Sequence, residues 1–175
     1  MIDAPEFSHI VKLSEIGPKP RTGKLAAGEE ERRALALRFD IHEISALTAT
    51  YKLAAGERGI AFTGLLTSDL HQSCAITGEA IPVQVRDKFD ILFIPKADPS
   101  ELEEEIELTE EECDLVEYEK SQIDLGEALA QTLYLSLDPY LRGPNADEAA
   151  RKKGLKSEES AGPFGALAAL KDKLG

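Results

Sequence analysis

Cys74, Cys113 and His71 are the residues of this 175-residue chain with the most evident capacity for chemistry. A cysteine becomes a nucleophile when a neighbouring base takes its proton, and His71 stands three positions before Cys74. On a strand, however, residues at an odd separation point to opposite faces. We therefore interpret Cys74 as a small, half-buried residue at a strand end and expect Cys74→Ser to be nearly silent.

The same residues do not predict a metal site. A structural zinc site needs about four ligands at characteristic spacings. His71, Cys74 and Cys113 match no such spacing, so we interpret them as free thiols and a surface histidine.

Residues 17–24 superficially resemble a phosphate-binding loop. Five residues separate its two glycines, where the motif has four, and Leu25 stands where the motif has Ser or Thr. Pro18 and Pro20 also remove two of the backbone N–H donors on which such a loop depends. We expect no catalytic residue, no metal and no cofactor.

The charge balance is strongly acidic, with 33 Asp and Glu against 20 Lys and Arg and a formal net charge of −13. This disfavours a simple nucleic-acid binder, because neutralising phosphates requires clustered basic residues, and it favours basic partners such as ribosomal proteins. Residues 101–119 hold eleven acids and no base. Such a block is typical of a solvated loop, and the functional alternative is a surface that holds a basic protein or repels RNA.

Two cysteines in a chain of this size favour a reducing compartment. Residues 1–10 lack the pattern of a signal peptide, and no apolar run reaches the length of a membrane span. We expect a cytoplasmic protein with no membrane partner.

The elements that position these residues follow from periodicity. Residues 29–39 predict a helix, with acids in the first turn and Arg38 in the last. Alternating apolar side chains predict long strands that start near Ser45, Ile60 and Ala80, and the first two form an antiparallel hairpin. We expect an α+β fold: an antiparallel β-sheet, which could curl toward a barrel, packed with two helices.

The second helix is predicted by its start signal. Asp124 and Glu127 fit a capping box, in which Asp124 accepts from the Glu127 N–H while the Glu127 side chain reaches back. Leu125, Leu129 and Leu133 then recur at the spacing of one buried stripe. Capping alone explains Asp124 and Glu127, and the functional alternative is that both contact a partner.

We expect a single α+β domain over residues 1–140, followed by residues 141–175 as a flexible linker with a short C-terminal helical peptide. Phe164, Leu167 and Leu170 give that peptide an apolar character. It either docks on its own domain or enters the groove of a partner, and the sequence leaves both open.

A basic cluster lies in the predicted linker. Arg151, Lys152 and Lys153 are candidate RNA contacts. They have no interleaved aromatic residues, and Glu158 and Glu159 follow closely, so we favour a plain linker here.

Three segments follow one another along the chain: CAITGEAI with the strand after it, the acidic stretch that leads into IDLGEAL, and GPFGAL near the end. In this order they resemble the YceD-like family of bacterial proteins, specifically its alphaproteobacterial type. Proteins of that family are needed for accumulation of large-subunit ribosomal RNA. The third segment is similar to the family's closing Asn-Pro-Phe-Ala-x-Leu peptide. Thr77 replaces the second cysteine of a Cys-x-x-Cys found in many relatives, and residues 141–144 lack cysteines that some relatives carry there. No metal-binding role therefore transfers.

The resemblance implies a non-enzymatic ribosome-biogenesis factor with no catalytic residues. Its implied partners are large-subunit ribosomal RNA, precursor particles that contain this RNA, or another pre-ribosomal component. The alternative is an acidic escort for a basic ribosomal protein, without direct RNA contact. The sequence predicts no oligomeric state.

Overall fold

The structure is a computed structural model that describes residues 5–96 and 114–154. The chain forms two compact units. The first combines Met1–Gln72 with Pro82–Leu137, and the second combines Ser73–Ile81 with Asp138–Gly175. The loop that begins at Ser73, which the sequence analysis placed inside the first domain, thus belongs with the C-terminal part.

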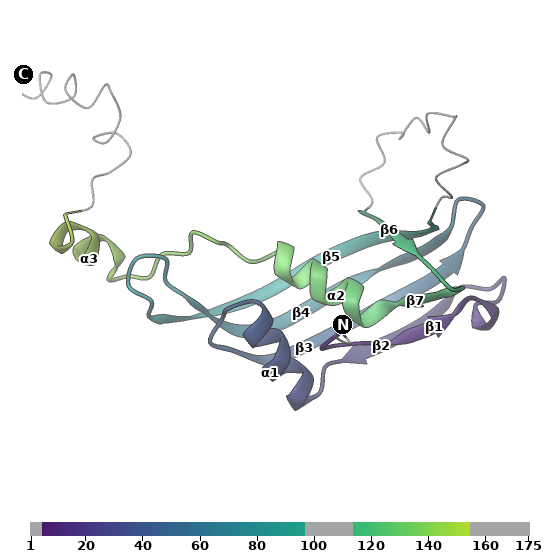
Figure 1. The fold of residues 1–175 in the computed structure, drawn as a ribbon, viewed down its shortest axis with the longest axis horizontal. Helices are drawn as coiled ribbons and strands as arrows, with labels where there is room; N and C mark the ends of the chain where they lie inside the picture. The colour runs from purple at the N-terminus through teal and green to yellow at the C-terminus, as the bar shows by residue number, and fades with distance from the viewer. Residues whose placement is uncertain (1–4, 97–113, 155–175) are drawn as a thin grey trace, which may run out of the picture. The chain divides into compact units, whose positions relative to one another are not determined.

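A five-stranded sheet forms the main layer of the first unit (Figure 1). Its spatial order is β2 (Arg21–Ala26), β3 (Glu43–Ala55), β4 (Ile60–Ser73), β5 (Ala80–Pro95) and β6 (Asp114–Tyr118). The pairs β2–β3 and β3–β4 are antiparallel, whereas β6 runs parallel to β5. The sheet is open, with β2 and β6 at its edges, so the expected α+β class is confirmed without closure into a barrel.

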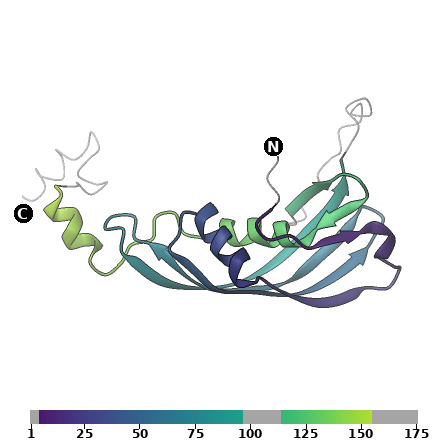
Figure 2. The same ribbon diagram turned by 60° about the horizontal axis from the view of Figure 1, so that its bottom comes forward.

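Two helices and a small second sheet complete the first unit. Helices α1 (Glu29–Arg38) and α2 (Leu125–Leu135) lie on the same face of the large sheet (Figure 2). The second sheet pairs β1 (Ile10–Lys12) with β7 (Gln122–Asp124), antiparallel, and a 3-10 turn (Leu13–Glu15) follows β1. The two helices and the three long strands predicted within residues 1–140 are present.

The face of the sheet that carries the helices is apolar and buried, and we call it the inner face. Phe62 lies at its centre, fully buried, with ring centroids 5.4 Å from Tyr51, 4.8 Å from Phe89 and 6.0 Å from Phe93. The predicted stripe of α2 packs onto this face, with Leu125, Leu129 and Leu133 at 1% exposure or less. The apolar side chains of the predicted alternating pattern therefore point to the face that the helices cover.

The opposite face, which we call the outer face, carries the alternate side chains of the same strands. Among the described residues of the first unit, no helix or strand covers it (Figure 2). Its threonines pair across strands, as where the Thr48 and Thr67 hydroxyls lie 2.8 Å apart. One face in the core and one in solvent is the usual arrangement of an antiparallel sheet.

Two elements differ from the sequence-based expectation. Strand β2 occupies part of the segment compared above with a phosphate-binding loop, and it is an edge strand in which Leu25 alone is buried. Helix α3 (Ala146–Lys152) lies inside the predicted flexible linker, so these residues are helical instead. An Arg142–Asp147 ion pair of 2.9 Å and an i,i+4 pair between Lys152 and Glu148 help to hold it.

Candidate functional site

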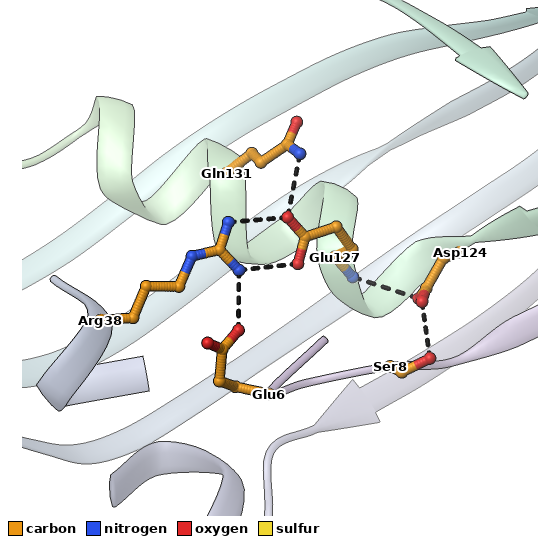
Figure 3. Close-up of polar contacts among 6 residues, drawn as sticks. All are labelled: Glu6, Ser8, Arg38, Asp124, Glu127 and Gln131. Atoms are coloured by element: carbon orange, nitrogen blue, oxygen red, sulfur yellow. Dashed lines mark hydrogen bonds and ion pairs between the residues drawn. The ribbon is translucent and has the colours of Figure 1, made fainter. Parts of the chain in front are cut away.

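An ion-pair network joins the two helices of the first unit to the N-terminal segment (Figure 3). Arg38, at the end of α1, donates from both terminal nitrogens to the two carboxylate oxygens of Glu127 on α2, each at 2.8 Å. It also donates to Glu6 at 2.9 Å, and Gln131 donates to Glu127 at 3.0 Å. A bidentate guanidinium–carboxylate pair fixes orientation as well as distance, so the network sets how α1 and α2 meet.

The electrostatics of this network are mutually reinforcing. The hydrogen bond from Arg38 holds the pKa of Glu127 below its ordinary value of 4.5, against the opposing effect of burial. The bonds to Glu127, and then to Glu6, raise the pKa of Arg38 further above its already high value. Both side chains are therefore ionised at neutral pH, and the Arg38 guanidinium is about one-third exposed.

Asp124 caps α2 as the sequence predicts, accepting from the N–H groups of Gly126 and Glu127 at 3.0 and 3.2 Å. It also binds the N-terminal segment, through the Ser8 hydroxyl at 2.6 Å (Figure 3). The His9 N–H donates to it as well, at 2.8 Å. The second half of the predicted capping box is wrong, because Glu127 turns toward Arg38 instead of back toward Asp124. Both candidate partner-contact carboxylates thus already have partners within the chain.

Gly126 is the position at which the N-terminal segment crosses α2. A Cβ atom at Gly126 would lie 2.7 Å from the Phe7 carbonyl oxygen, 2.8 Å from the His9 nitrogen and 2.9 Å from Ser8 Cα. All three of these atoms belong to the backbone, so none of them can move aside as the end of a flexible side chain could. The glycine of the IDLGEAL segment is therefore required for close approach of two backbones.

A shallow groove lies beside the network, between the ends of α1 and α2. It has a volume of about 310 Å³ and is lined by Arg38, Phe39, Gln131, Tyr134 and Leu135; we call it the helix groove. Tyr134 and Leu135 are 56% and 75% exposed, and the Tyr134 ring lies 5.3 Å from that of Phe39. Adjacent exposed apolar side chains beside charged groups are typical of interaction surfaces.

Cys74 occupies a different environment, within the second unit. It is 2% exposed, so it is fully buried and not half-buried as expected from the sequence. Its sulfur accepts from the Gly143 N–H at 3.3 Å, and the neighbouring Ala75 N–H donates to the Leu141 carbonyl at 2.8 Å. The Thr77 hydroxyl and the Gly143 N–H thus both belong to the Cys74 environment.

These donors favour the thiolate of Cys74. The Gly143 N–H, followed by the Thr77 hydroxyl and backbone, lowers the pKa of the thiol from 9.0 to about 6. The surrounding donors therefore favour the anionic form of the sulfur, while its burial denies access to large reactants. Cys113 lies outside the described residues.

Two of the three residues of the basic cluster, Arg151 to Lys153, have partners within the second unit. Lys153 donates to the Ile76 carbonyl at 3.0 Å, and Lys152 pairs with Glu148 at 2.6 Å. Arg151 stays exposed at the end of α3. The other predicted contact residues, Phe164, Leu167 and Leu170, lie outside the described residues.

Sequence reasoning missed Arg38 as a link between helices, and it missed the helix groove. A usable signal existed in α2, where Tyr134 and Leu135 are apolar but fall off the predicted stripe. Over residues 5–96 and 114–154, no three His, Cys, Asp or Glu side chains are grouped to hold a metal ion. Nor does any helix there have the length and apolar composition needed to cross a membrane.

Comparison with protein-family models, with curated proteins and with solved structures found no match to this chain.

Proposed function

We propose that this protein is a cytoplasmic, non-enzymatic binding factor that supports accumulation of large-subunit ribosomal RNA by attaching to a pre-ribosomal component. The order of its sequence segments, which resembles that of the YceD-like family, suggests the process. The observation that favours action by binding is the helix groove, because it presents apolar side chains on a rigid helical frame.

The frame is rigid because the groove shares residues with the ion-pair network. Arg38 lines the groove and is itself held by Glu127 and Glu6, while Gln131 lines it and is bonded to Glu127. Leu135 and Tyr134 lie on the same helix as Gln131 and Glu127, so their backbone is already helical before a partner binds. Pre-organisation of this kind lowers the entropic cost of association.

The process is tested by deleting the gene and measuring the ratio of large-subunit to small-subunit ribosomal RNA. We expect the ratio to fall, and restoration of the wild-type gene to recover it. An unchanged ratio would contradict the proposed function.

The groove is tested with Leu135→Asp, which adds a charge at a side chain that is 75% exposed. Leu115→Asp is the matched control, because Leu115 is an exposed leucine on β6, outside the groove. We expect Leu135→Asp to lose the pre-ribosomal partner in a pull-down and Leu115→Asp to retain it. Equal retention by both variants would exclude the groove as the contact.

The second candidate is an acidic escort for a basic ribosomal protein, without RNA contact. It is favoured by residues 97–113, which carry nine acids and no base. The pull-down is therefore divided into a nuclease-treated half and an untreated half. Large-subunit RNA precursors found only in the untreated half support RNA engagement, whereas one basic protein that persists in both halves supports the escort.

A further inference from the structure

We propose that the outer face of the large sheet binds the phosphate backbone of RNA through Lys24, Lys52, Arg86 and Lys88. This inference rests on the proposed function and names the surface that engages RNA. Its basis is the placement of four cations on a sheet face that no described helix or strand of the first unit covers (Figure 2), in a chain whose net charge is −13.

Strand register places two of the cations among hydroxyl groups. Lys24 on β2 lies opposite Thr50 on β3, and Lys52 on β3 lies between Thr22 on β2 and Thr63 on β4. Directly opposed residues of an antiparallel pair point to the same face. Lysine and threonine side chains therefore alternate between β2 and β3. On β4, Thr63 continues the row of Thr22 and Lys52, whereas Leu65 follows Thr50 in the other row. Ammonium groups and hydroxyls both donate to phosphate oxygens.

The other two cations lie on β5, which neighbours β4. The Gln84 amide donates to Asp69 at 2.8 Å, which joins the outward sides of the two strands close to the loop that connects them. Arg86 and Lys88 are the next two outward positions after Gln84, at steps of about 7 Å along the strand. The four cations thus spread over β2, β3 and β5, about 14 Å across the sheet.

These cations are available for a ligand. All four are exposed, and within residues 5–96 and 114–154 none of their side chains makes a hydrogen bond or an ion pair. Asp69, one of the three acids on the outer face of β2 to β5, is bonded to Gln84, and Glu43 accepts from Ser45 at 3.1 Å. Asp90 is the third, two positions after Lys88, so cations outnumber acids around the threonines.

The strong negative net charge does not oppose this assignment, because it is concentrated elsewhere in the sequence. Residues 97–113 alone account for nine negative charges of the net −13. The outer positions described here carry no aromatic ring on which a base could stack. Recognition through cations and hydroxyls alone is directed at the RNA backbone and tolerates any base sequence.

The test is a titration of the full-length protein into a fluorescently labelled single-stranded RNA, repeated over a series of salt concentrations. We expect wild-type affinity to fall with salt with a logarithmic slope of up to about −3 for four phosphate contacts. Replacing Lys24, Lys52, Arg86 and Lys88 together by Gln should remove most of that slope and weaken low-salt binding at least about tenfold. Each single replacement should reduce the slope by about 0.7.

The matched control removes the same charge away from the outer face, by Gln replacements at Lys12, Lys19, Arg33 and Lys120. We expect it to bind RNA as the wild type does, and circular dichroism to show both quadruple variants folded. The inference is overturned if the wild type binds no RNA at low salt, or if both quadruple variants weaken binding equally. A basic face that instead takes an anionic vesicle but not RNA also overturns it.

The ribosomal RNA ratio separates this inference from the proposed function. If the outer-face variant loses RNA binding in the titration and fails to restore the ratio in a deletion strain, both stand. If it loses RNA binding yet restores the ratio fully, the face binds RNA but the function does not depend on it. If deletion leaves the ratio unchanged, the proposed function fails whatever the titration shows.

Discussion

The inner and outer faces of the sheet share the same strands but differ in what they hold. On the inner face, Phe62 and Leu66 are completely buried beneath the helices. On the outer face, Thr50 and Lys52 from the neighbouring strand are exposed. Because side chains alternate along a strand, each residue serves either the core or the surface. Substitutions on one face of these strands should therefore leave the side chains of the other face in place.

The largest expected effect compares the two faces directly. Phe62→Ala removes the central ring of the aromatic group and should lower the free energy of unfolding by about 3–5 kcal/mol. Thr50→Ala, on the exposed side of the neighbouring strand, should change it by less than about 1 kcal/mol. Urea denaturation of both variants measures the difference, and similar losses would break the distinction between faces.

The next largest effect concerns Gly126, where the N-terminal segment crosses α2. Gly126→Ala forces a Cβ against the backbone of Phe7–His9 and should destabilise the unit by about 1–3 kcal/mol. Gly17→Ala is the control, since nothing lies within 4 Å of a Cβ built there. Thermal unfolding should separate the two, and a Gly126→Ala protein as stable as the wild type would contradict the close crossing.

A smaller effect comes from the ion pairs at the border of the inner layer. Arg38→Ala should cost about 1 kcal/mol at pH 7, because the network is partly exposed. The pKa of Glu127 is depressed, so its share is complete above the ordinary value of 4.5 and is lost as the pH falls through its lower value in the folded protein. The stability gap between wild type and variant should therefore narrow from pH 6 to pH 3. Arg33→Ala, which breaks an exposed pair with Glu29, should show no comparable gap.

The last comparison concerns Cys74, which is as buried as the inner-face residues but is held by N–H donors. Its thiol should titrate near pH 6, seen as thiolate absorbance in a protein in which Cys113 is replaced by Ser. Because its pKa is depressed, its stabilising contribution is complete above about 9 and is lost as the pH falls through about 6. Cys74→Ser should abolish this pH dependence and leave the inner-face core intact. A titration near the ordinary value of 9.0 would contradict the hydrogen bonds from Gly143 and Thr77.

The long strands and the capped helix were predictable because their signals are local and repeated. β3, β4 and β5 each alternate over many residues, and Asp124 precedes a clear apolar stripe. Strand β2 was missed because an edge strand with one buried residue has little periodicity, and nearby prolines suggest a loop. The pairing of β2 with β3 places Gly23 opposite Tyr51, and the Tyr51 ring lies over this glycine.

The candidate site was less predictable because it depends on residues far apart in sequence. Arg38 and Glu127 are 89 positions apart, and nothing local in either helix indicates the other. Each outer-face cation can be recognised in the sequence as a polar position of an alternating strand. That the four lie close together on one face depends on the order of the strands in the sheet. The direction of β6, parallel to β5, is likewise set by pairing and not by its own five residues.

The crossing of the N-terminal segment over α2 has a consequence for synthesis. Ser8 bonds to Asp124, 116 positions later, and β1 has β7 as its partner. At translation rates of 5–20 residues per second, residues 7–12 leave the ribosome roughly 6–23 s before their binding partners are made. During that interval the sheet can form from β2 onward. The side chains of Phe7 and Val11, which are buried in the folded protein, are still exposed to solvent at that stage. Residues 7–12 are thus briefly exposed to chaperones and proteases, and the synthesis of α2 ends that exposure.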